Sequence, residues 1–67
     1  MALNKLIEKT VAENTVKPVV VEKIFHRPGK PYFVLKLNSP GGEFFKAFNK
    51  ETGKIQWYLG PDGFCVF

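Results

Sequence analysis

Turn signals divide most of this 67-residue chain into short segments, and their spacing limits the fold more than any other feature. After Pro18, clusters of Pro, Gly, Asn and Asp recur about every 10–12 residues, between runs of β-branched or aromatic residues. Short strands joined by tight turns pair with their sequence neighbours, which predicts an antiparallel meander. The four clusters lie at residues 27–30, 38–42, 49–54 and 60–63.

The runs between these clusters have the composition of strands, because Val, Ile, Phe, Tyr and Trp are enriched in them. Gly29 and Gly53 stand at turn positions where a positive φ is needed, and glycine adopts it without steric cost. The sequence therefore predicts four or five antiparallel strands. Their expected ranges are 19–25, 32–37, 43–48, 54–59 and 64–67.

Residues 2–14 follow the spacing i, i+3, i+4, i+7 of an amphipathic helix. Asn14 tolerates the left-handed conformation that ends a helix, and Pro18 opposes continuation. A helix this short is marginal in isolation, so we expect it to dock on the sheet. Its stripe consists of Leu3, Leu6, Ile7, Thr10, Val11 and Asn14.

These elements predict an α+β fold within a single domain, residues 1–67, with a helix at 2–14 and a β-meander at 18–67. Such a sheet either stays open or curls into a small SH3-like or OB-like barrel. The chain is short enough that only about 60% of its unfolded surface is buried on folding, so its core is marginal.

Strict alternation assigns the side chains of the sheet to two faces. Trp57 is expected to point toward the helix and Tyr58 away from it. The third strand is ambiguous, and placing Lys46 in water favours Phe45 and Ala47 on the helix side. The expected core positions of the sheet are Phe33, Leu35, Leu37, Phe45, Ala47, Ile55, Trp57 and Leu59.

The opposite face would then carry Tyr, Phe, Lys and Gln side chains that no expected element covers. Monomers seldom expose a large apolar patch without using it. Bases could stack on these rings while lysines contact phosphates, a protein partner could cover them, or a second copy or barrel closure could hide them. The candidate nucleic-acid-binding residues are Arg27, Lys30, Tyr32, Lys36, Phe44, Lys46, Phe48, Lys54 and Tyr58.

The charge distribution favours the first of these uses. The net charge is +4, and residues 17–54 hold eight basic but only three acidic side chains. Lysine suits phosphate contact better than bidentate base recognition. We therefore expect a small non-enzymatic module that binds single-stranded or structured nucleic acid. The alternative is a protein-interaction factor, such as a small viral inhibitor that docks on a host protein.

Residues with catalytic or metal-binding chemistry are scarce, so we expect no enzyme, no cofactor and no metal site. His26 is the only histidine and has no evident orienting partner, which a general base requires. Cys65 is the only cysteine, which excludes an internal disulfide. Its apolar neighbours suggest a small buried side chain rather than a reactive thiolate.

Two further expectations concern partners and location. The small core and the surplus aromatic surface favour a homodimer, with the apolar residues of the first strand, 19–24, covered on both sides. No stretch resembles a signal peptide or reaches about 20 apolar residues, so we expect no membrane contact. The expected location is the cytoplasm, or the host-cell cytoplasm if the protein is viral.

Overall fold

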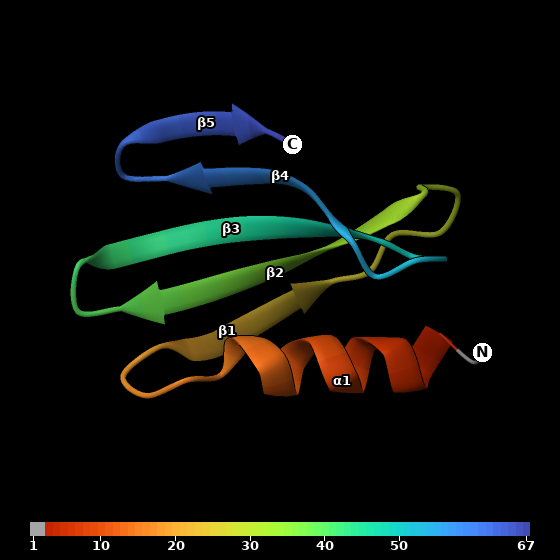
Figure 1. Cartoon of the computed structure of the whole chain (residues 1–67), viewed down its shortest axis with the longest axis horizontal. Helices are drawn as coiled ribbons and strands as arrows, with labels where there is room; N and C mark the ends of the chain where they lie inside the picture. Colours follow the sequence, from red (N-terminus) through yellow and green to blue (C-terminus); the bar gives the residue numbers. More distant parts are fainter. Residues whose placement is uncertain (1–2) are drawn as a thin grey trace.

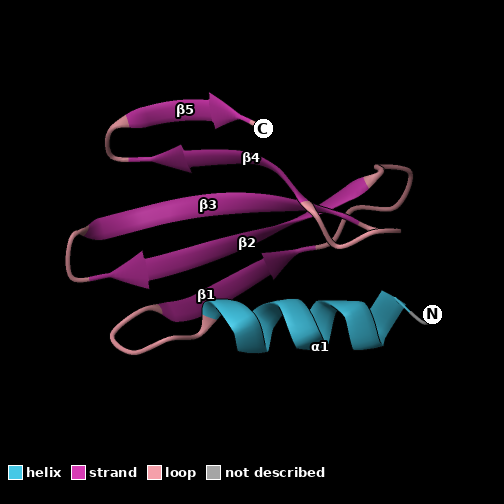
Figure 2. Ribbon diagram, in the orientation of Figure 1, coloured by secondary structure: helices cyan, strands magenta, loops and turns pink. Residues whose placement is uncertain are grey.

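A computed structural model describes residues 3–67 and contains one helix and a five-stranded antiparallel sheet (Figure 1). The strands lie in the order β1-β2-β3-β4-β5, so each pairs with its neighbour in the sequence (Figure 2). The expected helix and meander are confirmed; Ala2, the first residue expected in the helix, lies outside the described residues. The elements are α1 (Leu3–Asn14), β1 (Val20–Phe25), β2 (Tyr32–Ser39), β3 (Gly42–Asn49), β4 (Ile55–Gly60) and β5 (Gly63–Val66).

The sheet of residues 3–67 is open, with β1 and β5 as its two edges, and it does not close into a barrel. The tight turns that connect its strands match the sequence. Gly29 has φ 83° and Gly53 has φ 74°, as expected for left-handed turn positions. In the β3–β4 loop, the Asn49 side-chain oxygen accepts hydrogen bonds from the amides of Glu51 and Thr52 at 2.7 and 3.0 Å.

The core lies between α1 and the first three strands. Phe33, Leu35 and Leu37 of β2 are completely buried, and Phe48 of β3 stacks on Phe33 with ring centroids 5.8 Å apart. The helix runs alongside β1, on the side of the molecule away from β5 (Figure 1). The partly buried residues that pack against this core are Leu6, Ile7, Val11, Val19, Val21, Phe44 and Ile55.

The expected orientation of β3 is wrong. A two-residue turn joins Ser39 to Gly42, so these two residues pair. Counting away from the turn along both strands places Leu35 opposite Lys46. Directly opposed residues of an antiparallel pair share a face, so Lys46 lies on the helix side with Leu35. Phe44 and Phe48 share that side, whereas Phe45 and Ala47 point away from the helix.

Lys46 tolerates this position because its long side chain reaches a polar partner. Its ammonium donates a hydrogen bond to the Asn14 side-chain oxygen at 3.1 Å and lies 5.7 Å from the centre of the Phe44 ring. A lysine can thus bury its aliphatic stem while its charged end stays solvated or paired. The assumption that Lys46 needs the water-exposed face led to the wrong orientation.

The expected orientation of Trp57, Tyr58 and Leu59 is also wrong, because β4 contains a bulge. Phe48 pairs with Ile55 but Ala47 pairs with Trp57, so Gln56 is an extra residue in β4. An extra residue reverses the facing of everything after it. Ile55 therefore lies on the helix side as expected, but Trp57 and Leu59 point away from α1 and Tyr58 points toward its side.

Candidate functional site

The sheet surface that faces away from α1 is the strongest candidate for a functional site. We call it the open face. Cross-strand pairing places side chains of all five strands on it, most of them apolar. Its apolar members are Val20, Phe25, Val34, Phe45, Ala47, Trp57, Leu59, Phe64 and Val66, together with the Tyr32 ring.

Aromatic rings on the open face contact each other across the strands. Trp57 lies at the centre, 6.1 Å from the Tyr32 ring in an edge-on arrangement and 5.7 Å from the Phe64 ring. Phe25 and Phe45 form a further pair at 6.4 Å. Edge-on and tilted pairs are arrangements that aromatic rings prefer. The Phe25, Tyr32, Phe45 and Trp57 side chains are half-buried, and Phe64 is exposed.

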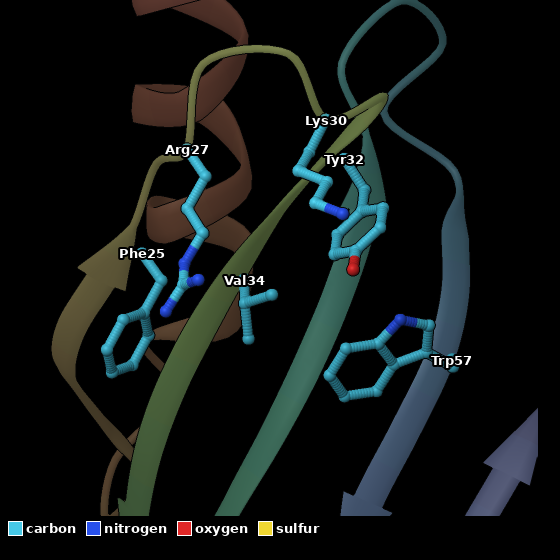
Figure 3. Close-up of a pocket in the computed structure, with 6 residues that line it drawn as sticks. All are labelled: Phe25, Arg27, Lys30, Tyr32, Val34 and Trp57. Carbon is cyan, nitrogen blue, oxygen red and sulfur yellow. The ribbon is translucent and has the colours of Figure 1, made fainter.

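A hollow of about 320 Å³ lies among these rings, near the end of the sheet where β1 turns into β2 (Figure 3). Trp57 and Tyr32 stand on one side of it and Phe25 on the other, with Val34 between them. Two cationic residues and no acidic residue line it. The lining residues are Phe25, Arg27, Lys30, Tyr32, Val34 and Trp57.

The turn geometry brings the cationic residues to the hollow. Arg27 and Lys30 are the first and last residues of the β1–β2 turn, closed by a hydrogen bond from the Lys30 amide to the Arg27 carbonyl at 3.4 Å. The Lys50 ammonium donates to the same carbonyl at 2.8 Å. The Lys50 amide donates to the Pro31 carbonyl at 3.0 Å, so Lys50 of the β3–β4 loop holds the β1–β2 turn in place.

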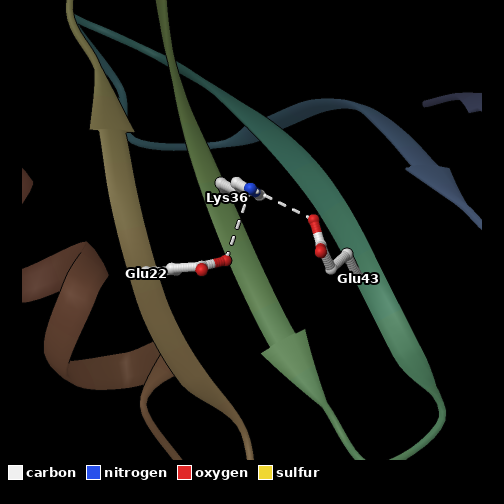
Figure 4. A network of polar contacts seen from close by, with 3 residues as sticks. All are labelled: Glu22, Lys36 and Glu43. Atoms are coloured by element: carbon white, nitrogen blue, oxygen red, sulfur yellow. Dashed lines mark ion pairs between the residues drawn. The ribbon is translucent and has the colours of Figure 1, made fainter.

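Lys36 also lies on the open face, but carboxylates surround it (Figure 4). Its ammonium is 3.1 Å from a Glu43 oxygen and 3.5 Å from a Glu22 oxygen. The hydrogen bond to Glu43, followed by the charges of Glu22 and Glu43, raises the pKa of Lys36 above its usual value. Its charge is largely balanced, unlike that of Lys23, which lies 5.0 Å from the centre of the Phe25 ring.

The structure divides the residues predicted for nucleic-acid binding. Arg27, Lys30 and Tyr32 come together in the hollow, and Lys36 shares their face. Lys54 is exposed beside the start of β4. The remaining four lie on the helix side of the sheet, where the Phe44 and Tyr58 rings pair at 5.7 Å. Those four are Phe44, Lys46, Phe48 and Tyr58.

Sequence reasoning did not place on the open face two rings that line the hollow, Trp57 and Phe25. Trp57 was expected on the helix side of the sheet, and Phe25 was not assigned to a face. One signal was available for β3: a two-residue turn at 40–41 fixes the β2–β3 register, which pairs Phe48 with Phe33 on the helix side and leaves Ala47 on the open face. This register does not place Trp57, which lies in β4 beyond the bulge. No comparable signal in the sequence marks the bulge at Gln56, because the residues around it alternate normally.

The remaining chemically notable residues do not form a site. Cys65 is exposed, contrary to the expected burial, because none of the described elements forms a layer over β5. Among residues 3–67, no group of three His, Cys, Asp or Glu side chains could hold a metal ion. Within the same range, α1 is too short and too polar to cross a membrane.

Comparison with known protein families, with curated proteins and with solved structures found no match to this chain.

Proposed function

We propose that this protein binds single-stranded nucleic acid through the open face. The observation that carries the proposal is the hollow in which Arg27 and Lys30 lie beside the Tyr32 and Trp57 rings. Single-strand-binding proteins combine these two elements, aromatic side chains on which bases stack and a positively charged surface that follows the backbone. No catalytic step is included in the proposal.

The rings favour unpaired bases over a duplex. A base stacks on an aromatic side chain only when its own flat surface is accessible, which requires a single strand. A hollow of about 320 Å³ falls within the range of about 300–1,000 Å³ typical of small-molecule sites, so it can admit one base. Trp57 would stack on that base, and Phe64, which contacts Trp57 and is exposed, would extend the stacking surface.

The cations at the rim favour phosphate contact. Arg27 and Lys30 come from one turn and flank the rings, so a strand whose base occupies the hollow would bring its phosphate groups near them. Lys23, at the Phe25 side of the open face, would extend this track. Lys36 contributes less, because Glu22 and Glu43 already balance its charge.

A fluorescence titration tests the proposal. Trp57 is the only tryptophan, so its emission reports directly on stacking at the hollow. Adding an oligothymidylate of about ten nucleotides should quench this emission, and Trp57→Ala should weaken binding by about 1–3 kcal/mol, measured by anisotropy of a labelled strand. The log–log salt slope should be roughly −0.7 for each phosphate contacted.

A matched pair of double variants separates specific phosphate contact from general attraction to a basic protein. Arg27→Gln with Lys30→Gln should flatten the salt slope. Lys5→Gln with Lys9→Gln removes the same charge from exposed helix positions and should leave the slope nearly unchanged. Absence of oligonucleotide binding at low salt would overturn the proposal and favour the alternative, a protein partner docked on the same rings.

A further inference from the structure

The free edge of β5 is the least protected part of the sheet. All four of its residues are exposed, with Phe64 at 61% and Val66 at 71% of their full accessibility. None of them is charged or proline. Among the described residues no strand pairs with the outer side of β5, so its outward backbone groups form the kind of edge that recruits another strand.

The opposite edge, β1, has the usual protections against strand pairing. It carries the charged residues Glu22 and Lys23, and the register shift between Val21 and Lys23 marks a bulge at Glu22. The helix runs alongside it (Figure 1). Charges, bulges and covering helices are devices that prevent edge-to-edge association. Pairing through β5 would therefore stop at two copies, because both edges of the combined sheet would be β1.

The hydrogen-bond pattern of the β4–β5 hairpin defines which groups of β5 point outward. The Phe67 amide donates to the Gln56 carbonyl at 2.9 Å, which makes these two residues a hydrogen-bonded pair. Bonded and non-bonded pairs alternate along an antiparallel ladder. Cys65 and Tyr58 are then also a hydrogen-bonded backbone pair. Phe64 and Val66 direct their amide and carbonyl groups toward the free edge.

We propose that the protein forms a homodimer in which β5 pairs antiparallel with β5 of a second copy. The two copies are related by a two-fold axis perpendicular to the sheet. One register pairs all the outward amide and carbonyl groups of Phe64 and Val66: Phe64 of each copy lies opposite Val66 of the other. That register places the two Cys65 residues opposite each other as a non-bonded pair at the axis. It also keeps the two open faces on the same side, and the proposal stands whether or not those faces bind nucleic acid.

Sedimentation equilibrium with two lysine variants tests the edge. The unmodified chain should sediment as a dimer at high micromolar concentration. Cys65→Lys places two like charges opposite each other at the axis and should give a monomer. Val20→Lys introduces the same charge on β1, where Val20 is 54% exposed, and should remain dimeric. A monomeric unmodified chain, or a dimer lost in the Val20 variant but kept in the Cys65 variant, would overturn the proposal.

Oxidative cross-linking tests the register. In the proposed pairing, the two Cys65 Cα atoms lie about 4.5 Å apart, within the range that a disulfide spans. Diamide takes one hydrogen from each thiol, forms the disulfide and is reduced to the hydrazine, so it should give a covalent dimer quickly. The variant Phe64→Cys with Cys65→Ser sets the thiols diagonally, about 7–8 Å apart, and should react much more slowly. Equal rates would rule out this register.

Discussion

The covered end of the sheet, which includes β2, and the uncovered end, which includes β5, both contain runs of apolar residues, but the environments of these residues differ. In β2, Phe33, Leu35 and Leu37 are fully buried, whereas in β5 Phe64 and Val66 are mostly exposed. The difference lies in the face that each side chain occupies. Phe33, Leu35 and Leu37 point toward α1, whereas Phe64 and Val66 lie on the open face, which none of the described elements covers. On the helix side too, one helix about 10 Å wide can cover only two or three strands spaced about 4.8 Å apart, so Cys65 is exposed there. Apolar alternation predicts a strand, but burial depends on a second layer.

The largest expected effect comes from the covered end. Phe33→Ala removes a fully buried ring that stacks on Phe48, and it should cost about 3–5 kcal/mol. A domain this small has only a few kcal/mol of total stability, so the variant should be largely unfolded. Phe64→Ala makes the same change at an exposed position and should cost far less. Urea unfolding followed by far-UV circular dichroism compares them; equal losses would contradict the difference between the two ends.

The elements of the fold were predictable because each depends on local signals. The turn glycines, the strand composition and the helical period all act over a few residues, and Gly29 and Gly53 have the backbone conformation expected of them. The facing of β3 and β4 was not predictable in the same way. It depends on the pairing register, which the two-residue turn at 40–41 sets for β3, and on the bulge at Gln56 in β4, and neither is visible in the alternation of residues within one strand.

Trp57→Ala should have the next largest effect on stability. The change removes the ring contacts with Tyr32 and Phe64, each worth about 0.5–1.5 kcal/mol beyond the area buried. The loss should therefore be smaller than that of Phe33→Ala, and the variant should stay folded at low denaturant. Circular dichroism is again the measurement, since the variant lacks the fluorescent residue. A Trp57 variant as unstable as the Phe33 variant would place Trp57 in the core, as the sequence first indicated.

The candidate site was predictable only where a turn determines it. Arg27 and Lys30 flank Pro28 and Gly29, and that turn brings them to the same end of the sheet whatever the register of later strands. Tyr32 follows this turn directly and lines the same hollow. Phe44, Phe48 and Tyr58 depend on the register and the bulge, and they lie on the other side of the sheet.

A pair of glycine variants tests how closely α1 contacts the β3–β4 loop. Gly53 and Gly29 both have positive φ, so an alanine at either should cost about 1–2 kcal/mol from the backbone alone. At Gly53 the new methyl carbon would lie 2.8 Å from a Leu6 methyl, whereas nothing lies within 4 Å at Gly29. Gly53→Ala should therefore lower the unfolding midpoint more than Gly29→Ala. Equal shifts would mean that Leu6 moves aside freely and that the helix is loosely docked at that loop.

The smallest effect concerns the ion pairs of Lys36 on the open face. Glu43 and Glu22 raise the pKa of Lys36 in the folded protein, so its charged form is stabilised by folding. This contribution is fully present below the lysine pKa of the unfolded chain, near 10.5, and disappears as pH rises through the higher folded pKa. The stability advantage of the unmodified chain over Lys36→Met should therefore be constant from neutral pH to about pH 10 and shrink above it.

Thermal unfolding at several pH values measures this advantage, with Lys9→Met as a control for losing an exposed lysine. At about 1 M salt such exposed ion pairs are screened. If the stability advantage is unchanged at high pH or persists at that salt concentration, it comes from the aliphatic stem of Lys36 rather than from its charge.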